Sequence, residues 1–395
     1  MKIGIYQTYW GCVGGGQRYV AVVAALLARS HDVEIVHHCE NFIPASVEEA
    51  MQVDLSRVDF RYVPTIERPN WPTNNPFRRL QLERELGREI SQPYDLYIDS
   101  SDIPPFFNHA KRGALLTHFP LVTFEEYHGR TSKEWRDRSL LKRWLSGAYQ
   151  RLEWRLRFGS YDRCIVNSEF TKRWMKRLWG LDSQVVYPPL RDGLNPQTKH
   201  QAILSIGAIR GAQHKKQSMM IDSFKTLCEN GLKEWRYVLM GASGPSEEDQ
   251  SALRSLKESA FGYPVEIHHD VSGHELKNAL ETSAILWHSM GLGVDAEREP
   301  RQMEHFGMVI TEAMAAGCVP IVFNGGGLPE ILNNGENGFL WTNTHDLRQM
   351  TLRLTSDCNR LSKMSDAAVD RSSIFASPAF ERRLLTTLSP LMDQT

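Results

Sequence analysis

Two glutamates flank a predicted helix start in the stretch MEHFGMVITEAMAAGCVPIVFNGGGLPE. Glu304 and Glu312 are eight residues apart, and the residues between them predict a short helix that opens at Phe306-Gly307. A helix N-terminus presents free N–H groups and a positive partial charge. We therefore expect it to bind a diphosphate, at Gly307 and Met308, without any side chain.

Carboxylates near such a terminus suit sugar hydroxyls, because they accept hydrogen bonds from O–H groups and repel phosphate. Glu304 lies just before the helix and is expected to contact a sugar; Glu312 is expected to reach the paired hydroxyls of a ribose. The alternative is two solvated surface acids. After the strand VPIVF, a triple-glycine turn is expected to precede a second helix start at Pro329 and Glu330.

Two basic side chains follow the strand predicted over AILSIGAI. Arg210 and Lys215 lie five residues apart, before a predicted helix, and would clamp a diphosphate at the carboxyl end of that strand. Arginine would do so by bidentate hydrogen bonds and lysine as a point charge. Lys216 is the alternative occupant of the lysine position, and ordinary solvated loop residues are the alternative interpretation.

The first half of the chain holds a second group of candidates. KIGIY predicts a buried strand, and the glycines up to Gly15 and Gly16 predict a loop before a helix. These glycines either let the backbone approach a phosphate or an acceptor, or form only a flexible turn; the G-x-G-x-x-G pattern of NAD sites is absent. His118 ends another predicted strand, in LLTHFP, and is either a ligand-binding or a structural histidine.

The stretch EHFGMVITEAMAAGCVPIV, with GGLPEIL and NGENGFL after it, resembles the donor-site motif of retaining GT-B glycosyltransferases of family 4. The resemblance implies that Glu304 contacts the transferred sugar and Glu312 the ribose. The backbone between these acids is implied to bind the diphosphate, at His305, Phe306, Gly307 and Met308.

Three further motifs resemble the same family. GGGQRY resembles its N-terminal glycine loop and implies donor contacts at Gly15 and Gly16. H-x-P at His118 resembles its active-site histidine, implied to hydrogen-bond to the donor sugar or the reacting region. Arg210 and Lys215 match its R-x4-K register, although the G-A-Q-H between them departs from the usual hydrophobic and acidic pattern.

The expected chemistry follows from the charges that develop during sugar transfer. Breaking the anomeric bond leaves an oxocarbenium-like sugar and a nucleotide diphosphate, so catalysis chiefly needs stabilisation of the leaving group. Arg210, Lys215 and the helix start at Gly307 are expected to supply it. No Asp-x-Asp pair stands at a strand end, so we expect no metal and no other cofactor. The resemblance implies retention of configuration, with a donor phosphate oxygen taking the acceptor's proton.

Short motifs, THFP, NSEFT and VVYPP, resemble the mannosyltransferases that extend lipid-linked oligosaccharides at the cytosolic face of a membrane. They imply GDP-mannose as donor and a polyprenyl-linked glycan as acceptor; UDP-glucose, UDP-N-acetylglucosamine and a small soluble acceptor are alternatives. Rival functions are a GT-B-fold sugar-nucleotide epimerase and a non-catalytic nucleotide-sugar binding protein. No extra acid and base set for an epimerase can be assigned, so a hexosyltransferase is predicted.

These residues must be held by α/β domains, because strand and helix patterns alternate along the chain. Further strands are predicted at DVEIVHH, VDFRYVP, YDLYIDSS, DRCIVNS, WRYVLMG, VEIHHDV and AILWHSM, and helices at 76–90 and 140–158. The resemblance implies the GT-B fold, two Rossmann-like doubly wound domains facing across a cleft. We expect an acceptor-side domain at 1–190, a nucleotide-sugar domain at 200–372, and a last helix, 377–395, packed back on the first.

Residues 130–180 are strongly basic, with fourteen lysines and arginines, five acids and five of the ten tryptophans. The predicted helix 140–158 carries an apolar stripe, while its basic residues lie mostly off that stripe. The helix either docks on an anionic membrane surface or packs its stripe on the domain with a solvated basic face. The stripe comprises Leu141, Trp144, Leu145, Ala148, Tyr149, Leu152 and Leu156; the basic residues are Lys142, Arg143, Arg151, Arg155 and Arg157.

The composition narrows the class of protein further. The 395 residues suffice for two cores, and a net charge of −1 without a binding motif argues against nucleic acid. Six cysteines without a C-x-x-C indicate a reducing compartment, and no apolar run is long enough to span a bilayer. We expect a cytoplasmic protein, either free or peripheral at the membrane face. The HHDVSGHEL turn is expected to contact the base, and 291–302 is either a mobile lid or an inert insertion.

Overall fold

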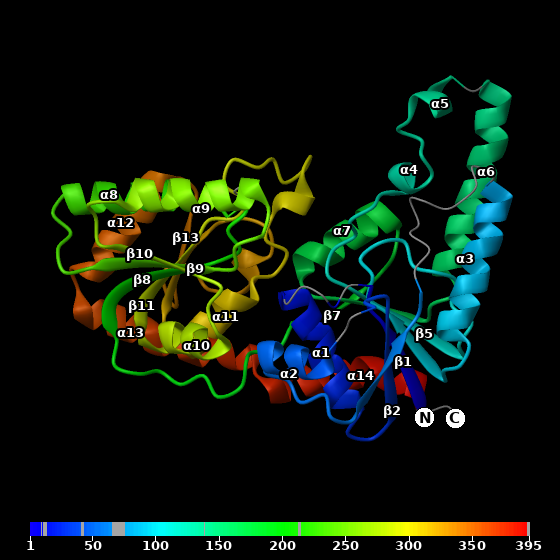
Figure 1. Cartoon of the computed structure of the whole chain (residues 1–395), viewed down its shortest axis with the longest axis horizontal. Coiled ribbons are helices and arrows are strands. Elements are labelled where there is room, and N and C mark those ends of the chain that lie inside the picture. Colours follow the sequence, from blue (N-terminus) through cyan, green and yellow to red (C-terminus); the bar gives the residue numbers. More distant parts are fainter. Residues whose placement is uncertain are drawn as a thin grey trace. The chain divides into compact units, whose positions relative to one another are not determined.

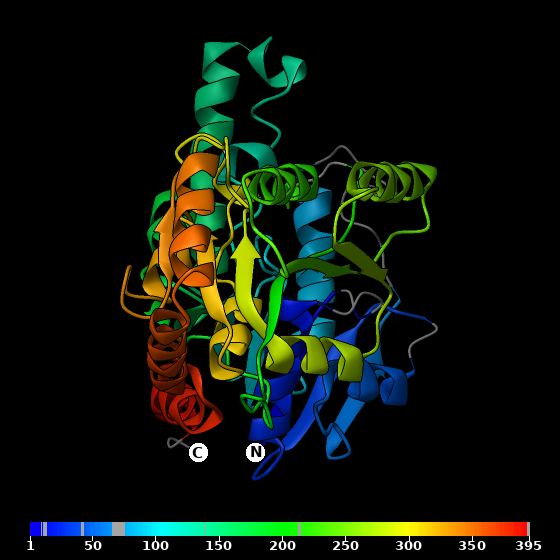
Figure 2. The same ribbon diagram turned by 90° about the vertical axis from the view of Figure 1, so that its left-hand side faces the viewer.

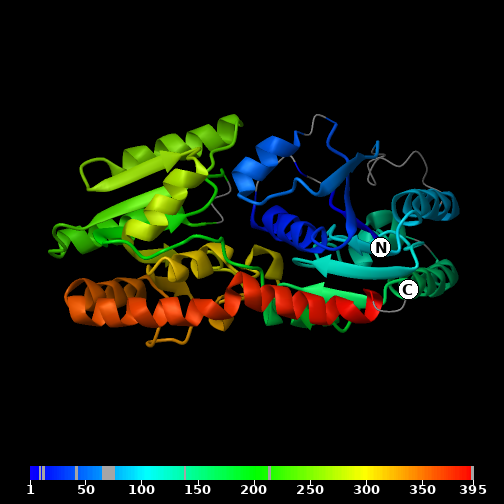
Figure 3. The same ribbon diagram turned by 90° about the horizontal axis from the view of Figure 1, so that it is seen from below.

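The computed structural model describes residues 1–8, 10, 14–40, 43–64, 76–137, 139–211 and 215–392. The chain divides into two units. Unit 1 combines Met1–Tyr187 with the chain from Glu381 onwards, and unit 2 is Pro188–Phe380. Helix α14 (Ser377–Met392) is one continuous element, drawn in red in Figure 3, so the chain passes from unit 2 back into unit 1 within a helix.

Unit 1 is built on a seven-stranded parallel sheet, with strand order β3-β2-β1-β4-β5-β6-β7. Apolar residues of these strands, such as Ile3, Ile35 and Ile98, are fully buried, because helices cover a parallel sheet on both faces. The strands are β1 (Lys2–Tyr6), β2 (Asp32–His37), β3 (Val58–Tyr62), β4 (Leu96–Asp99), β5 (Arg112–Thr117), β6 (Arg163–Val166) and β7 (Gln184–Val185).

The helices of unit 1 include a group that extends away from the sheet, formed by α4, α5 and α6 (Figures 1 and 2). Helices α3 and α6 lie side by side there, which the ion pair between Glu83 of α3 and Arg157 of α6 confirms. The helices are α1 (Gly15–Leu27), α2 (Pro44–Met51), α3 (Pro76–Ser91), α4 (Phe124–Tyr127), α5 (Lys133–Arg136), α6 (Leu140–Phe158) and α7 (Glu169–Trp179).

Unit 2 is a six-stranded parallel sheet of order β10-β9-β8-β11-β12-β13. Helices α8, α9 and α12 lie on one face and α10, α11 and α13 on the other (Figure 1). The strands are β8 (His200–Ile206), β9 (Arg236–Gly241), β10 (Val265–His269), β11 (Ser283–His288), β12 (Val319–Phe323) and β13 (Phe339–Trp341). The helices are α8 (Gln217–Glu229), α9 (Glu247–Ala260), α10 (Gly273–Thr282), α11 (Met308–Ala315), α12 (Thr344–Thr355) and α13 (Cys358–Ser372).

The prediction of two parallel, doubly wound sheets is confirmed, and every predicted strand is present. The expected helix start at Pro329 is wrong, because only the 3₁₀ turn Leu328–Glu330 forms there. Arg371 explains its end: the guanidinium donates to the carbonyls of Glu330 and Ile331, each at 3.0 Å, and occupies the acceptors that a longer helix would use.

The glycines at the start of α1 differ from expectation as well. Gly14 is the N-cap and Gly15 and Gly16 form the first turn of the helix, so they do not make a loop before it. A Cβ at Gly16 would lie 3.3 Å from Nε2 of His118, which is a tight contact for a Cβ. A residue without a side chain therefore suits the close approach of α1 to the end of β5.

Helix α6 contradicts the alternative in which its apolar stripe packs on the domain. Leu141, Trp144 and Leu145 are 67%, 65% and 54% exposed, whereas Arg157, predicted on the solvated face, is 1% exposed. The buried face is instead formed by Gly147, Gln150, Glu153, Trp154, Arg157 and Phe158. Among the helices of the described chain, none is both long and apolar enough to cross a bilayer.

Candidate functional site

A charged group in unit 2 gathers around Glu304. The Nζ atom of Lys215 lies 2.7 Å from Oε2 of Glu304, and Nε2 of His288 lies 3.1 Å from the same oxygen. Nζ of Lys215 is also 3.4 Å from Nε2 of His288. The side chains of Lys215 and Glu304 are 28% and 18% exposed, so the group is sheltered and still reached by solvent.

The electrostatics of this group favour charged Lys215 and Glu304 beside a neutral histidine. Burial by itself raises the pKa of Glu304, but the Lys215 ammonium and the hydrogen bond with His288 outweigh it and hold the pKa well below its usual range. Burial, reinforced by the Lys215 charge, lowers the pKa of His288 although Glu304 opposes this. The group therefore holds one fixed cation and one fixed anion at neutral pH.

The glycine-rich turn after β12 positions the backbone of Glu304. The Gly327 N–H donates to the Glu304 carbonyl at 2.8 Å, and a Cβ on Gly326 would lie only 2.1 Å from that oxygen. Gly326 also has φ +62°, which side chains rarely adopt. The glycines that the sequence suggested as free turn residues are thus needed for tight backbone packing under the carboxylate.

Lys215 and His288 are placed by the carboxyl ends of β8 and β11, which are neighbouring strands. The Ser289 hydroxyl donates to the Lys215 carbonyl at 2.7 Å and ties the two loops together. Lys216 has a different position: it is the left-handed N-cap of α8, with φ +52°. Of the two lysines, Lys215 is therefore the one that contacts Glu304 in the described chain.

Helix α11 begins at the end of this loop. Its N-cap, Gly307, has φ +105°, and a Cβ there would lie 2.8 Å from side-chain carbons of Ile310 and Leu328. Among the described residues, no side chain accepts a capping hydrogen bond at this terminus, where the first N–H groups of a helix have no partner within the helix. The terminus lies three residues beyond Glu304 in the chain.

The remaining predicted donor residues of unit 2 are placed around α11. Phe306 is 3% exposed and packs edge-on against Phe375, with ring centroids 5.6 Å apart. Glu312 is 5% exposed on α11, and its Oε1 lies 3.7 Å from Nε of Arg191. Glu312 is thus buried next to an arginine, which excludes the interpretation as a solvated surface acid.

Arg210 is not part of the charged group. Its guanidinium lies 3.4 Å from Oδ2 of Asp249 at the start of α9, and the side chain is 45% exposed. Asp249 also accepts from the Gly211 N–H at 2.9 Å. Within the described chain, Arg210 is thus paired with Asp249, whereas Lys215 is paired with Glu304. The intervening residues 212–214 lie outside the described chain.

His118, at the end of β5 in unit 1, is held from both sides of its ring. Nδ1 lies 3.1 Å from Oδ2 of Asp102, and Nε2 lies 3.1 Å from the carbonyl oxygen of Gly16. Asp102 also accepts from the His118 N–H at 2.6 Å. Tyr19 packs edge-on against the imidazole, with ring centroids 5.7 Å apart.

These two acceptors favour the doubly protonated imidazolium of His118. Burial lowers the pKa of His118, but the charge and hydrogen bond of Asp102 outweigh it, so the net pKa lies above the ordinary 6.5. Asp102 itself has φ +55°, an uncommon conformation for a residue other than glycine. The strained aspartate therefore orients the histidine that the sequence singled out.

Sequence reasoning missed His288, Asp102 and Arg191 as members of these groups. A signal existed for the first two: His288 lies in the predicted strand AILWHSM and ends β11, and Asp102 directly follows the predicted strand YDLYIDSS, at the edge where parallel sheets bind ligands. Arg191 lies between the domains predicted at 1–190 and 200–372, where a basic residue carries no such signal.

The HHDVSGHEL turn and the loop 291–302, for which the sequence suggested roles, are both built from local turns and hydrogen bonds. In the HHDVSGHEL turn, Ser272 and Glu275 form a capping box at the start of α10, and Asp270 accepts from Ser243. Residues 291–302 form successive turns that end in the 3₁₀ turn Pro300–Gln302, with Pro300 buried. Within the described residues, no three His, Cys, Asp or Glu side chains gather as a metal would need, and no described cysteine forms a disulfide.

Two family models match consecutive parts of the chain. The model described as Glycosyltransferase Family 4 matches residues 13–191, and that described as Glycosyl transferases group 1 matches residues 188–370. The boundary between the matches coincides with the division between the units at Tyr187. Both halves of the chain are thus typical of the same class of enzyme.

Several relatives share the name GDP-Man:Man(3)GlcNAc(2)-PP-Dol alpha-1,2-mannosyltransferase. The Dictyostelium discoideum protein is 24% identical over 258 residues, which cover 60% of this chain and 49% of the relative. The Xenopus laevis protein is 31% identical over 182 residues, which cover 42% of this chain and 35% of the relative. The chain spans half or less of the length of these relatives.

Solved structures share the fold over nearly the whole chain. A glycosyltransferase from Rickettsia africae superposes with a TM-score of 0.69 at 15% identity and covers 100% of this chain and 99% of its own. HepE of Anabaena, solved with UDP and glucose, has a TM-score of 0.68 at 15% identity and covers 99% of this chain and 100% of its own. With two matching family models and this GT-B fold, the chain belongs to glycosyltransferase family 4.

Proposed function

We propose that this glycosyltransferase moves a hexose from a nucleotide-diphosphate sugar to a hydroxyl of a glycan or lipid-linked acceptor, with retention and without a metal. The observation that carries the proposal is the Lys215–Glu304 pair, 2.7 Å apart, just before the uncapped N-terminus of α11. A lysine and a helix N-terminus attract phosphate, and a carboxylate accepts hydrogen bonds from sugar hydroxyls. One loop thus offers both kinds of contact that a sugar diphosphate needs.

The proposed reaction breaks the bond between the anomeric carbon and the donor phosphate oxygen. The acceptor oxygen bonds to the anomeric carbon on the same face, and its proton passes to the departing phosphate oxygen. The products are a glycoside and a nucleoside diphosphate. Lys215 and the N–H groups at Gly307 and Met308 would stabilise the charge on the leaving group. Glu304 would then exchange part of its contact with Lys215 for the sugar hydroxyls.

Arg210 and Glu312 have supporting roles in this proposal. Arg210 would have to leave Asp249 to reach a phosphate, and its 45% exposed side chain has the freedom to do so. Glu312 would contact the ribose from the buried side of α11, with Arg191 balancing its charge at 3.7 Å. In unit 1, the His118 imidazolium would have to give up its Nε2 contact with the Gly16 carbonyl to donate a hydrogen bond on the sugar side of the reaction, with Gly15 and Gly16 of α1 beside it.

The donor we favour is GDP-mannose and the acceptor a polyprenyl-linked glycan. The relatives from Dictyostelium discoideum and Xenopus laevis carry names that specify GDP-Man and a dolichyl-diphosphate acceptor. A UDP-sugar is the alternative donor, because the structural neighbour HepE was solved with UDP and glucose. An acceptor of this kind would place the enzyme peripherally at a membrane.

A donor screen tests the proposal. The protein is incubated with GDP-mannose, UDP-glucose or UDP-N-acetylglucosamine, and the melting temperature and release of nucleoside diphosphate are followed with and without bacterial or eukaryotic lipid extracts. We expect one donor to stabilise the protein and lipid to increase release. Conversion of the donor to an isomer without release would assign an epimerase instead. Stabilisation without any release would leave only a binding protein.

A further inference from the structure

The outward face of α6 is an exposed apolar surface. Leucines and a tryptophan repeat along one side of the helix from its first residue to its last turn, at the spacing of one helical face. We name this set the outer stripe: Leu140, Leu141, Trp144, Leu145, Leu152 and Leu156, which are 80%, 67%, 65%, 54%, 55% and 51% exposed. Such a run of exposed large apolar side chains marks an interaction surface.

Basic residues lie within and beside the outer stripe, and no acid of the helix lies on that face. At 100° per residue, Arg151 and Arg155 fall inside the arc of the stripe, between Leu140 and Leu141, and Lys142 falls just beyond its edge on the side of Leu156. All three are exposed. The one acid of the helix, Glu153, points inward and is 6% exposed. The face therefore combines apolar area with uniformly positive charge.

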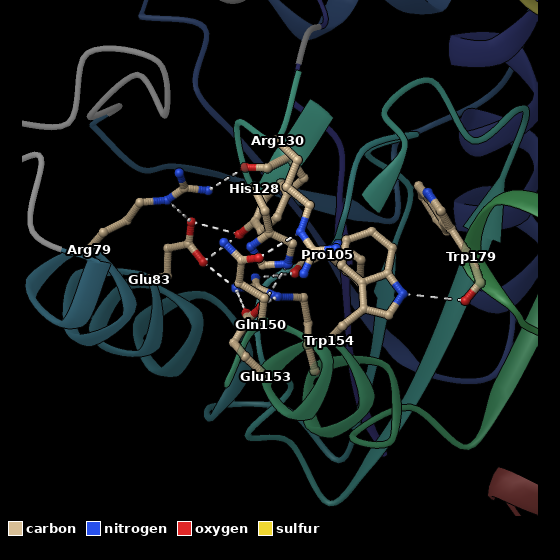
Figure 4. A network of polar contacts seen from close by, with 11 residues as sticks. Arg79, Glu83, Pro105, His128, Arg130, Gln150, Glu153, Trp154 and Trp179 are labelled. Carbon is tan, nitrogen blue, oxygen red and sulfur yellow. Dashed lines mark hydrogen bonds and ion pairs between the residues drawn. The ribbon is translucent and has the colours of Figure 1, made fainter. Parts of the chain in front are cut away.

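The opposite face of α6 is fixed to unit 1 by a buried ionic network (Figure 4). Arg157 donates to Glu83 of α3, to Glu153 one turn earlier, and to the Pro105 carbonyl at 2.7 Å. The Tyr127 hydroxyl donates to Glu83 at 2.7 Å. Because these hydrogen bonds and ion pairs hold the inner face of α6, the helix cannot rotate its stripe inward without breaking them.

We propose that the outer stripe of α6 docks on an anionic lipid bilayer, with the helix lying in the plane of the interface. Apolar side chains would enter the boundary between headgroups and acyl chains, with Trp144 at headgroup level, while Lys142, Arg151 and Arg155 contact anionic headgroups. The charge pattern favours this partner. An apolar protein groove or a second copy of this face would present no acidic groups to pair with Lys142, Arg151 and Arg155. The proposal rests on the proposed function in one respect: a lipid-linked acceptor would require the enzyme to work at a membrane.

Vesicle co-sedimentation tests the surface without any donor or turnover. The full chain is mixed with vesicles of phosphatidylcholine alone or with 30% phosphatidylglycerol, at low and at physiological salt. We expect binding to the anionic vesicles that weakens with salt. Arg151→Gln with Arg155→Gln should weaken binding about 25-fold, since each basic residue near the surface contributes roughly a fivefold factor. Leu141→Ser with Leu145→Ser should also weaken it.

Matched controls separate docking from general charge and hydrophobicity. Arg254→Gln with Lys257→Gln removes two exposed positive charges from α9, and Phe261→Ser removes an exposed aromatic ring in unit 2; neither should alter binding. All the substituted residues are exposed, so every variant should keep the wild-type melting temperature.

Three results would overturn the proposal. They are no binding of the intact chain to anionic vesicles at low salt, equal losses in the α6 and control variants, and concentration-dependent self-association that Leu141→Ser with Leu145→Ser abolishes. The last would make the stripe an interface between copies. A failed donor screen with intact vesicle binding would overturn the proposed function alone.

Discussion

Unit 1 and unit 2 each hold a sheltered group of charges. The two groups differ in how exposed the charged side chains are and in how many polar partners surround the cation. Arg157 in unit 1 is 1% exposed, and its partners Glu83 and Glu153 are 2% and 6% exposed. Lys215 and Glu304 in unit 2 are 28% and 18% exposed. The first group is sealed inside the protein, whereas the second can exchange a protein contact for a ligand.

The polar partners of the two groups sharpen the difference. Arg157 has two carboxylates and a backbone carbonyl around it, and burial lowers the pKa of the neighbouring His128 to about 3, so that histidine adds no charge. Lys215 has one carboxylate and a neutral histidine. A cation with spare hydrogen-bonding capacity beside a helix N-terminus suits anion binding, and a fully surrounded one suits structure.

The largest expected effect comes from breaking the buried ionic network of Arg157 in unit 1. Arg157→Met leaves the buried Glu153 without its cation and Glu83 with Arg79 alone, and should lower the free energy of unfolding by about 3–5 kcal/mol. Urea denaturation measures this. The matched control is Arg155→Met on the exposed face of the same helix, which should change stability by less than about 0.5 kcal/mol. Similar values for the two variants would show that the Arg157 network does not anchor α6.

A smaller effect on stability and a large effect on turnover are expected in the accessible group. Glu304→Gln keeps the shape of the side chain and removes its charge, so we expect kcat to fall about 100-fold while the nucleotide dissociation constant changes far less. Steady-state kinetics and nucleotide titration check this. If turnover and affinity fall by the same factor, Glu304 does not act on the sugar.

The smallest expected effect concerns His118 and its aspartate. Its pKa is raised by Asp102, so its contribution to stability is fully present below about pH 6.5 and is lost as the pH rises through the folded pKa. Asp102→Asn leaves burial to dominate and should bring the pKa of His118 below 6.5. An NMR pH titration, with His118→Gln to assign the signal, measures it. An unmoved pKa would show that Asp102 does not hold the imidazolium.

Much of the fold followed from local patterns, since apolar runs such as Ile3 to Ile5 are buried strands. Strands β7 and β13 were missed because two and three residues are too short to show a period. The orientation of α6 was also not predictable. Its buried face includes Gln150, Glu153 and Arg157, which only distant partners such as Glu83 make stable.

The candidate site was predictable where one loop contains it, as between Glu304 and Glu312. Contacts between loops were not: His288 reaches Glu304 across 16 residues, and Lys215 reaches it across 89. The sequence favoured Lys215 over Lys216 by its register alone, because the left-handed turn at Lys216 that directs the two apart appears only in the folded loop.

The central claim is that the Lys215–Glu304 pair receives the donor diphosphate, and comparing the two adjacent lysines tests it most directly. Lys215→Met and Lys216→Met are assayed for donor-induced thermal stabilisation and for kcat with the donor found in the screen. We predict that Lys215→Met loses at least about 100-fold in kcat, a loss of about 3 kcal/mol, while Lys216→Met keeps nearly wild-type activity. Equal activity of the two variants, or a loss confined to Lys216→Met, would contradict the account.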